Sequence, residues 1–157
     1  RKPEAAPVGP EQLPAECRVL LDGLSAVQHN GKNGVVLRYL SEKGRYAVEV
    51  QGEQMALRPA NLIQLLTVQG GDCEGVVRGI CDAGVEVHVQ GEVRTCAIES
   101  IILPEGARVR LLGLSREEYN DRIVEIRDFD QETERYVVRL DHTTQLRVRP
   151  RNVSLRL

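Results

Sequence analysis

Residues 18–25 read Arg-Val-Leu-Leu-Asp-Gly-Leu-Ser, and residues 108–115 read Arg-Val-Arg-Leu-Leu-Gly-Leu-Ser. The two stretches lie 90 positions apart, as Gly23 and Gly113 show. Further identities keep the same register: Asn30 with Asn120, Arg45-Tyr46 with Arg135-Tyr136, and Val48 with Val138. Identities at one constant offset indicate that the chain folds as copies of a single unit.

Each copy ends on an Arg-Pro-x-Asn motif, after one inserted residue in the second copy. Residues 57–62 read Leu-Arg-Pro-Ala-Asn-Leu, and residues 148–153 read Val-Arg-Pro-Arg-Asn-Val. Because proline cannot donate to a sheet ladder, Pro59 and Pro150 predict the end or the edge of a strand. The Asn that follows can hold a turn, such as a single 3₁₀ turn, before a short closing strand.

Residues 135–140 alternate in character, with Tyr136, Val138 and Leu140 facing one way and Arg135, Val137 and Arg139 the other. A period of two is typical of a strand with one buried face. Residues 45–50 repeat the alternation, and turn-forming Asn-Gly, Lys-Gly and Gln-Gly pairs lie nearby. Several short strands in each copy, without a helical pattern, predict a small and partly open barrel.

A third, shorter copy lies between these two. Residues 89–92 repeat the Val-Gln-Gly-Glu of residues 50–53, and residues 75–77 repeat the Gly-Val-Val of residues 34–36. The Ser-Ile-Ile of residues 100–102 stands where the first copy has Asn61-Leu62-Ile63. The middle copy lacks both the Gly-Leu-Ser element and the Arg-Tyr pair, so we expect a divergent version of the same unit.

The combination of Gly-Leu-Ser, a Tyr/His-Asn turn, Arg-Tyr-x-Val and Leu/Val-Arg-Pro-x-Asn resembles the SH3-like repeats, related to KOW-type modules, of many algal and protist proteins. It covers both outer copies nearly end to end and the middle one in part. The resemblance implies an all-β chain of three tandem small SH3-like β-barrels, the middle one shorter. The expected divisions are a Pro/Ala-rich tail over 1–16, then repeats over 17–66, 67–104 and 105–157.

Composition narrows the classes of partner. The net charge is −2, and residues 69–106 carry 7 acidic against 2 basic side chains. Phosphate contacts supply most of the affinity of a nucleic-acid binder, which therefore shows a basic excess that this chain lacks. Aromatic residues make up 3% of the chain, which offers few stacking platforms for bases. The sequence contains no run of about 18 apolar residues, so we expect no transmembrane segment.

The four cysteines and three histidines predict neither catalysis nor a metal site. Cys17, Cys73, Cys81 and Cys96 form no C-x-x-C pair, so we expect free, unbridged thiols without a bound metal. His29, His88 and His142 have no nucleophile or ligand set at a sensible spacing, and no Gly-rich phosphate loop is present. The sequence therefore predicts a non-enzyme without catalytic residues, metal or cofactor.

Arginines are the candidate binding residues. Arg58 and Arg149 stand beside a proline at a predicted strand edge, where a guanidinium can reach a carboxylate of a partner. Arg147, Arg149, Arg151 and Arg156 alternate along what the pattern predicts to be one strand face. The protein-binding set is thus Arg58, Arg147, Arg149 and Arg151. For the recurring Asn30 and Asn120, a structural turn role is the favoured interpretation.

The resemblance implies interaction modules, and two functions stay open. In the first, the chain is a structural, accessory subunit of a larger organellar assembly and binds the other protein subunits of that assembly. The second is a KOW-type RNA-binding or ribosome-associated module, which the acidic middle disfavours. The chain starts at Arg1, as after removal of a targeting peptide, and the repeats are protist-like. These features favour an organelle: the stromal side of an algal thylakoid, next to a photosystem supercomplex, or a mitochondrion, with the cytoplasm also open.

Overall fold

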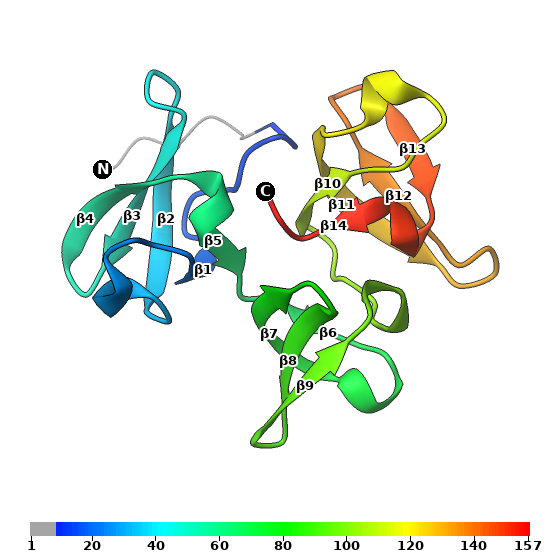
Figure 1. Cartoon of the computed structure of the whole chain (residues 1–157). Coiled ribbons are helices and arrows are strands. Elements are labelled where there is room, and N and C mark those ends of the chain that lie inside the picture. Colours follow the sequence, from blue (N-terminus) through cyan, green and yellow to red (C-terminus); the bar gives the residue numbers. More distant parts are fainter. Residues whose placement is uncertain (1–8) are drawn as a thin grey trace, which may run out of the picture.

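The computed structural model describes residues 9–157, and most of the predicted tail, residues 1–8, lies outside the described residues. The described chain is all-β, as the alternating patterns predict, and it forms three antiparallel sheets that lie in three lobes (Figure 1). Its only helical pieces are single 3₁₀ turns of three residues each, at Val27–His29, Pro59–Asn61, Gly71–Cys73, Ile98–Ser100, Glu117–Tyr119 and Pro150–Asn152. The prediction of an all-β chain is confirmed.

The first and third sheets have the same topology. The first has the order β4-β3-β2-β1-β5, and its strands are β1 (Arg18–Leu21), β2 (Asn33–Leu40), β3 (Arg45–Val50), β4 (Glu53–Leu57) and β5 (Leu62–Gln64). The third has the order β13-β12-β11-β10-β14, and its strands are β10 (Arg108–Leu111), β11 (Ile123–Asp130), β12 (Arg135–Arg139), β13 (Gln145–Val148) and β14 (Val153–Ser154). In both, the closing strand pairs with the first strand across the sheet.

The middle sheet is a shortened version of the other two. It has the order β6-β7-β8-β9, with β6 (Thr67–Val68), β7 (Gly75–Cys81), β8 (Gly84–Val89) and β9 (Glu92–Cys96). A single bridge between Gln69 and Ile102 stands where the other sheets pair their first and closing strands. A β-bulge recurs at one position of all three sheets, at Val36/Arg38, Val77/Gly79 and Ile126/Asp128. A bulge bends a strand where one residue is left unpaired, and its recurrence supports the alignment of the three copies.

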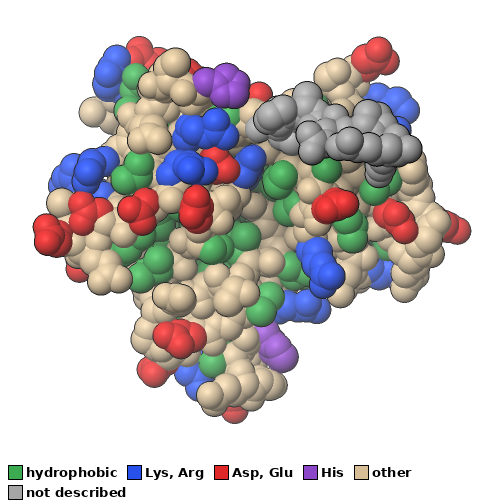
Figure 2. All heavy atoms as spheres, turned by 180° about the vertical axis from the view of Figure 1, so that it is seen from behind, with side chains coloured by type: hydrophobic (Ala, Val, Ile, Leu, Met, Phe, Trp, Pro, Cys, Tyr) green, Lys and Arg blue, Asp and Glu red, His purple; other side chains and the backbone are tan. Residues whose placement is uncertain are grey.

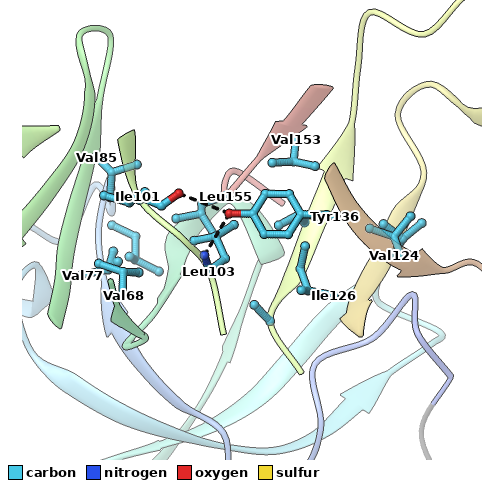
Figure 3. Close-up of a cluster of buried hydrophobic side chains, with 14 of the residues drawn as sticks. Val68, Val77, Val85, Ile101, Leu103, Val124, Ile126, Tyr136, Val153 and Leu155 are labelled. Carbon is cyan, nitrogen blue, oxygen red and sulfur yellow. Dashed lines mark hydrogen bonds between the residues drawn. The ribbon is translucent and has the colours of Figure 1, made fainter. Parts of the chain in front are cut away.

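The apolar side chains form two cores that do not follow the boundaries of the sheets. One core combines the middle and third sheets and also takes in Leu20 and Ile63 of the first (Figure 3). The other belongs to the first sheet but includes the last residue, Leu157. The C-terminal end therefore lies between the first and third lobes (Figure 1). Shared cores join the lobes, since burying apolar surface against a neighbour gives small units the area they lack.

A buried tyrosine fixes the segment that precedes each outer sheet. The Leu103 N–H donates to the Tyr136 hydroxyl at 2.9 Å, and that hydroxyl donates to the Ile101 carbonyl at 3.2 Å (Figure 3). In the first sheet, the Leu13 N–H donates to the Tyr46 hydroxyl at the same distance of 2.9 Å. Leu13 is only 2% exposed and belongs to the core of the first sheet. Thus the repeated unit includes Leu13, which the sequence assigned to an extended tail.

We expect Tyr136→Phe to lower the free energy of unfolding by about 1–2 kcal/mol, because the Leu103 N–H loses its partner at a buried position. Tyr46→Phe should cost about 1 kcal/mol, since one hydrogen bond is lost there rather than two. Urea unfolding measures both. Tyr119→Phe is the matched control, because Tyr119 is half-buried and its hydroxyl makes no hydrogen bond with any residue from 9 to 157. Equal effects at all three tyrosines would contradict the assigned role.

Arg108 and Gln64 connect the first sheet to the third. The Gln64 amide donates to the Arg108 carbonyl at 2.7 Å, and the Arg108 N–H donates back to Gln64 Oε1 at 2.9 Å. The Arg108 guanidinium donates to the carbonyls of Gln12 and Gly106 and to Glu125 Oε2. Arg139 pairs with the other oxygen of Glu125 at 2.8 Å. This satisfied polar network is buried where the two outer lobes and residues 9–16 meet.

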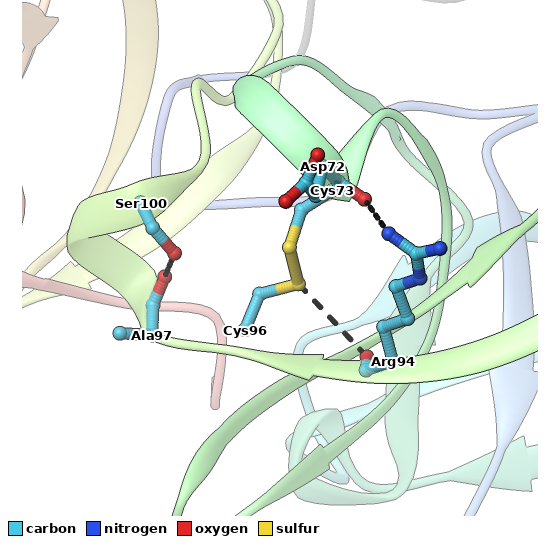
Figure 4. The surroundings of a disulfide bond; sticks show 6 residues. All are labelled: Asp72, Cys73, Arg94, Cys96, Ala97 and Ser100. Carbon is cyan, nitrogen blue, oxygen red and sulfur yellow. Dashed lines mark hydrogen bonds between the residues drawn. A yellow bond between two sulfur atoms is a disulfide. The ribbon is translucent and has the colours of Figure 1, made fainter.

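The expectation of four free thiols is wrong. Cys73 and Cys96 form a disulfide, which ties the 3₁₀ turn before β7 to the end of β9 (Figure 4). Beside it, Arg94 donates to the Asp72 carbonyl at 2.8 Å and fastens the same turn a second time. The antiparallel pairing of β7, β8 and β9 brings the two cysteines together, although they are 23 residues apart in the chain. Cys17 and Cys81 are free, and burial raises the pKa of the Cys17 thiol.

Candidate functional site

A groove of about 490 Å³ opens at one end of the first sheet. The start of β3, the start of the Pro59–Asn61 turn and the half-buried Tyr39 ring of β2 contribute most of its wall. The Tyr39 ring packs on Tyr46 with its centroid 4.9 Å away. Lys43, Arg45, Arg58 and, from the third sheet, Arg110 bring positive charge to this groove, and Glu11 brings one negative charge.

The third sheet carries a groove at the equivalent place, with a volume of about 870 Å³. Here the half-buried Phe129 ring packs on Tyr136, again at 4.9 Å between centroids. Arg135, Arg149 and Arg151 supply positive charge. The end of the middle sheet closes the far side with Glu99, Ser100 and Ile102.

The two grooves match position by position. Residues of one groove and their counterparts in the other are Tyr39 and Phe129, Lys43 and Thr133, Gly44 and Glu134, Arg45 and Arg135, Arg58 and Arg149, Pro59 and Pro150, and Ala60 and Arg151. One aromatic ring, two arginines and one proline are therefore common to both. Since the grooves are built by the repeat itself, their shared residues define one candidate site that occurs twice.

The middle sheet has a smaller groove, of about 300 Å³, at the same place. The register of β7, β8 and β9 puts Ile80 where the others have the aromatic ring, and it puts Gly84 and Ala97 where they have the two arginines. Glu99 stands at the position of Ala60 and Arg151. Residues 153–156 of the third sheet border this groove, and Arg156 donates to the Ile80 carbonyl at 3.2 Å. The middle groove thus lacks the aromatic ring and the two arginines that the outer grooves share.

Three of the four predicted arginines lie in these grooves. Arg58 lines the first, and Arg149 and Arg151 line the second; all three side chains are exposed. Within residues 9–157, none of the three forms an ion pair or donates a side-chain hydrogen bond. Their guanidinium groups are therefore available to a ligand.

Arg147 lies outside the grooves. It pairs with Asp130 at 2.8 Å, and that hydrogen bond, the largest cause, lowers the pKa of the Asp130 carboxyl. The expectation that Arg147, Arg149, Arg151 and Arg156 share one strand face is wrong. β13 ends at Val148, and Pro150 begins a 3₁₀ turn that redirects the chain. Proline ends the strand because it has no N–H to donate.

The recurring asparagines hold loops rather than ligands. The Asn30 side chain accepts from the Leu24 N–H at 2.8 Å and donates to the Leu24 carbonyl at 3.1 Å. Asn120 makes the same two bonds with Leu114. The Asn of each Arg-Pro-x-Asn motif donates to a loop carbonyl, Asn61 to Asp22 and Asn152 to Leu112. These bonds explain why the Gly-Leu-Ser loop and both Asn positions recur together.

The aromatic walls were missed at the level of sequence. Tyr39 and Phe129 stand 90 positions apart, but they differ in identity, so a search for identical residues does not find them. On the face in Figure 2, Lys and Arg side chains lie among Asp and Glu, without a continuous basic surface. In residues 9–157, no group of three His, Cys, Asp or Glu side chains is arranged to hold a metal ion.

The same residues contain no helix with the length and apolarity needed to cross a membrane. No family model matches the chain, and no curated protein matches it either. The fold and the site thus define an all-β protein of three antiparallel sheets with a repeated arginine-lined groove.

Proposed function

We propose that this chain is a non-catalytic structural protein that holds other proteins, an accessory subunit of a larger assembly, and that its three sheets are tandem SH3-like barrels. One observation carries the proposal: the outer sheets repeat a groove with an aromatic ring, a proline and two arginines. A repeat that preserves surface side chains as well as core residues favours a binding role for that surface, since packing alone does not require them.

The alternative function is RNA binding by KOW-type modules. Charge argues against it, because binding along a phosphate backbone calls for a continuous basic track. Here residues 69–106, between the outer repeats in the sequence, are acidic, and Glu11, Glu99 and Glu134 line the grooves. The proposed structural role includes a location in an organelle, either a chloroplast or a mitochondrion. Fractionation of cells tests that location.

Native-gel migration of the cellular protein tests the proposal. We expect the chain to migrate with a complex much larger than its own 17.5 kDa. The complex should survive ribonuclease and moderate salt. Migration as a free monomer contradicts the subunit role, and loss of the complex on ribonuclease treatment favours the RNA alternative.

A further inference from the structure

The two equivalent grooves present the same chemical features to a ligand. Each has a half-buried aromatic ring beside a proline, which together offer apolar contact. Each also has an exposed arginine next to that proline, Arg58 or Arg149, with no ion pair inside residues 9–157. A guanidinium binds a carboxylate through two parallel hydrogen bonds. The matching ligand combines a carboxylate with a neighbouring apolar side chain.

The segment that hydrogen-bonds to the buried tyrosine also borders each outer groove. In the third sheet, Ile102 lines the groove and the Leu103 N–H donates to the Tyr136 hydroxyl. In the first sheet, Glu11 and Gln12 line the groove from a turn, and the Leu13 N–H donates to the Tyr46 hydroxyl. Both grooves are open at the surface, and their volumes of about 490 and 870 Å³ accommodate a short peptide segment.

Charge separates a peptide from a nucleic acid. Glu11 in the first groove, and Glu99 and Glu134 in the second, would repel the closely spaced phosphates of a nucleic-acid strand. A peptide can place a single carboxylate on the arginine and keep clear of these residues. We infer that both outer grooves bind acidic segments of a protein partner, so that one chain holds two such segments, while the middle groove binds none. This inference rests on the protein-binding role proposed above and names its ligand.

The test uses backbone amide shifts of the full chain in NMR. The probe is the peptide Gly-Ala-Leu-Glu-Val-Ala-Tyr-Gly, and the control peptide has Gln in place of the Glu. We expect the probe to shift the amides of Arg45 and Ala60 in the first groove and of Arg135 and Arg151 in the second. The amides of Gly84 and Ala97 in the middle groove should stay in place. The Gln peptide should bind at least about 10-fold more weakly, because it offers no charge to the arginines.

Single substitutions separate the two sites. Arg58→Gln should weaken the first groove by about 10-fold or more and leave the second unchanged, and Arg149→Gln should do the reverse. Each groove serves as the folding control for the other. Arg78→Gln is the matched control, because Arg78 is exposed on β7 and lies outside all three grooves. A uridine oligonucleotide is titrated in parallel and should not shift the groove amides.

The outcomes distinguish this inference from the proposed function. If the probe shifts neither groove, or shifts the middle groove equally, the inference is overturned. The native-gel experiment still tests the proposed role as a structural subunit in that case. If the oligonucleotide binds the grooves more tightly than the probe and loses affinity steeply with salt, both proposals fail.

Discussion

Replacing Arg108 by Met is expected to lower the free energy of unfolding by about 3 kcal/mol, because it removes the charged centre of a buried hydrogen-bond network. Arg108 is 4% exposed, and burial, the largest cause, lowers its pKa although Glu125 raises it. Met fills much of the volume but bonds to neither the Gln12 and Gly106 carbonyls nor Glu125. Glu125 keeps Arg139, which limits the loss. Thermal and urea unfolding measure the effect.

The repeat supplies the control. Arg18 stands 90 positions earlier, at the same place in β1, but its side chain is exposed. Arg18→Met should change the stability by less than about 0.5 kcal/mol, as surface substitutions do. If the two substitutions lower the free energy of unfolding equally, Arg108 does not connect the outer lobes, and the hydrogen bonds around Gln64 do not stabilise the fold.

Arg18 and Arg108 also show where sequence reasoning ends. Both follow the same pattern in the same repeat, yet one is exposed and the other buried, because residue 108 meets Gln64 and Gln12 of distant segments. Period-two alternation predicts which face of a strand is buried within its own sheet. It carries no information on which lobe packs against which. The shared cores, with Leu20, Ile63 and Leu157 in a neighbour's cluster, were unpredictable for this reason.

Local chemistry was predictable wherever one residue type imposes a backbone conformation. Proline predicted the strand ends at Pro59 and Pro150, and the 3₁₀ turns follow there. Among the candidate site residues, Arg58 and Arg149 were found because they adjoin those prolines. Arg147 was assigned to the same face as Arg149 and Arg151 because the alternating arginines were read as one strand that continues past Pro150, whereas β13 ends at Val148. Tyr39 and Phe129 were missed because an aromatic wall depends on ring packing, at 4.9 Å on the next strand, and not on identity.

The Cys73–Cys96 bridge was not predicted, because the spacing of cysteines in a sequence indicates metal ligands but not disulfide partners. A disulfide needs only that two cysteines come close in space, and the hairpins of the middle sheet bring them together. We expect Cys73→Ala with Cys96→Ala to lower the stability by about 3 kcal/mol, since the bridge closes a loop that the unfolded chain would otherwise leave open. The middle sheet should be affected most, because it has the shortest first strand and only one closing bridge.

Reductant gives the test of this bridge in the unaltered chain. It should lower the melting temperature of the protein with both cysteines and leave the Cys73→Ala, Cys96→Ala variant unchanged. Cys17→Ala with Cys81→Ala is the matched control, because it removes the two free thiols and keeps the bridge. Unfolded without reductant, the unaltered chain should titrate as two thiols, and after reduction as four. Four thiols before reduction would show that the bridge does not form, and Arg94 and Asp72 would then hold the turn alone.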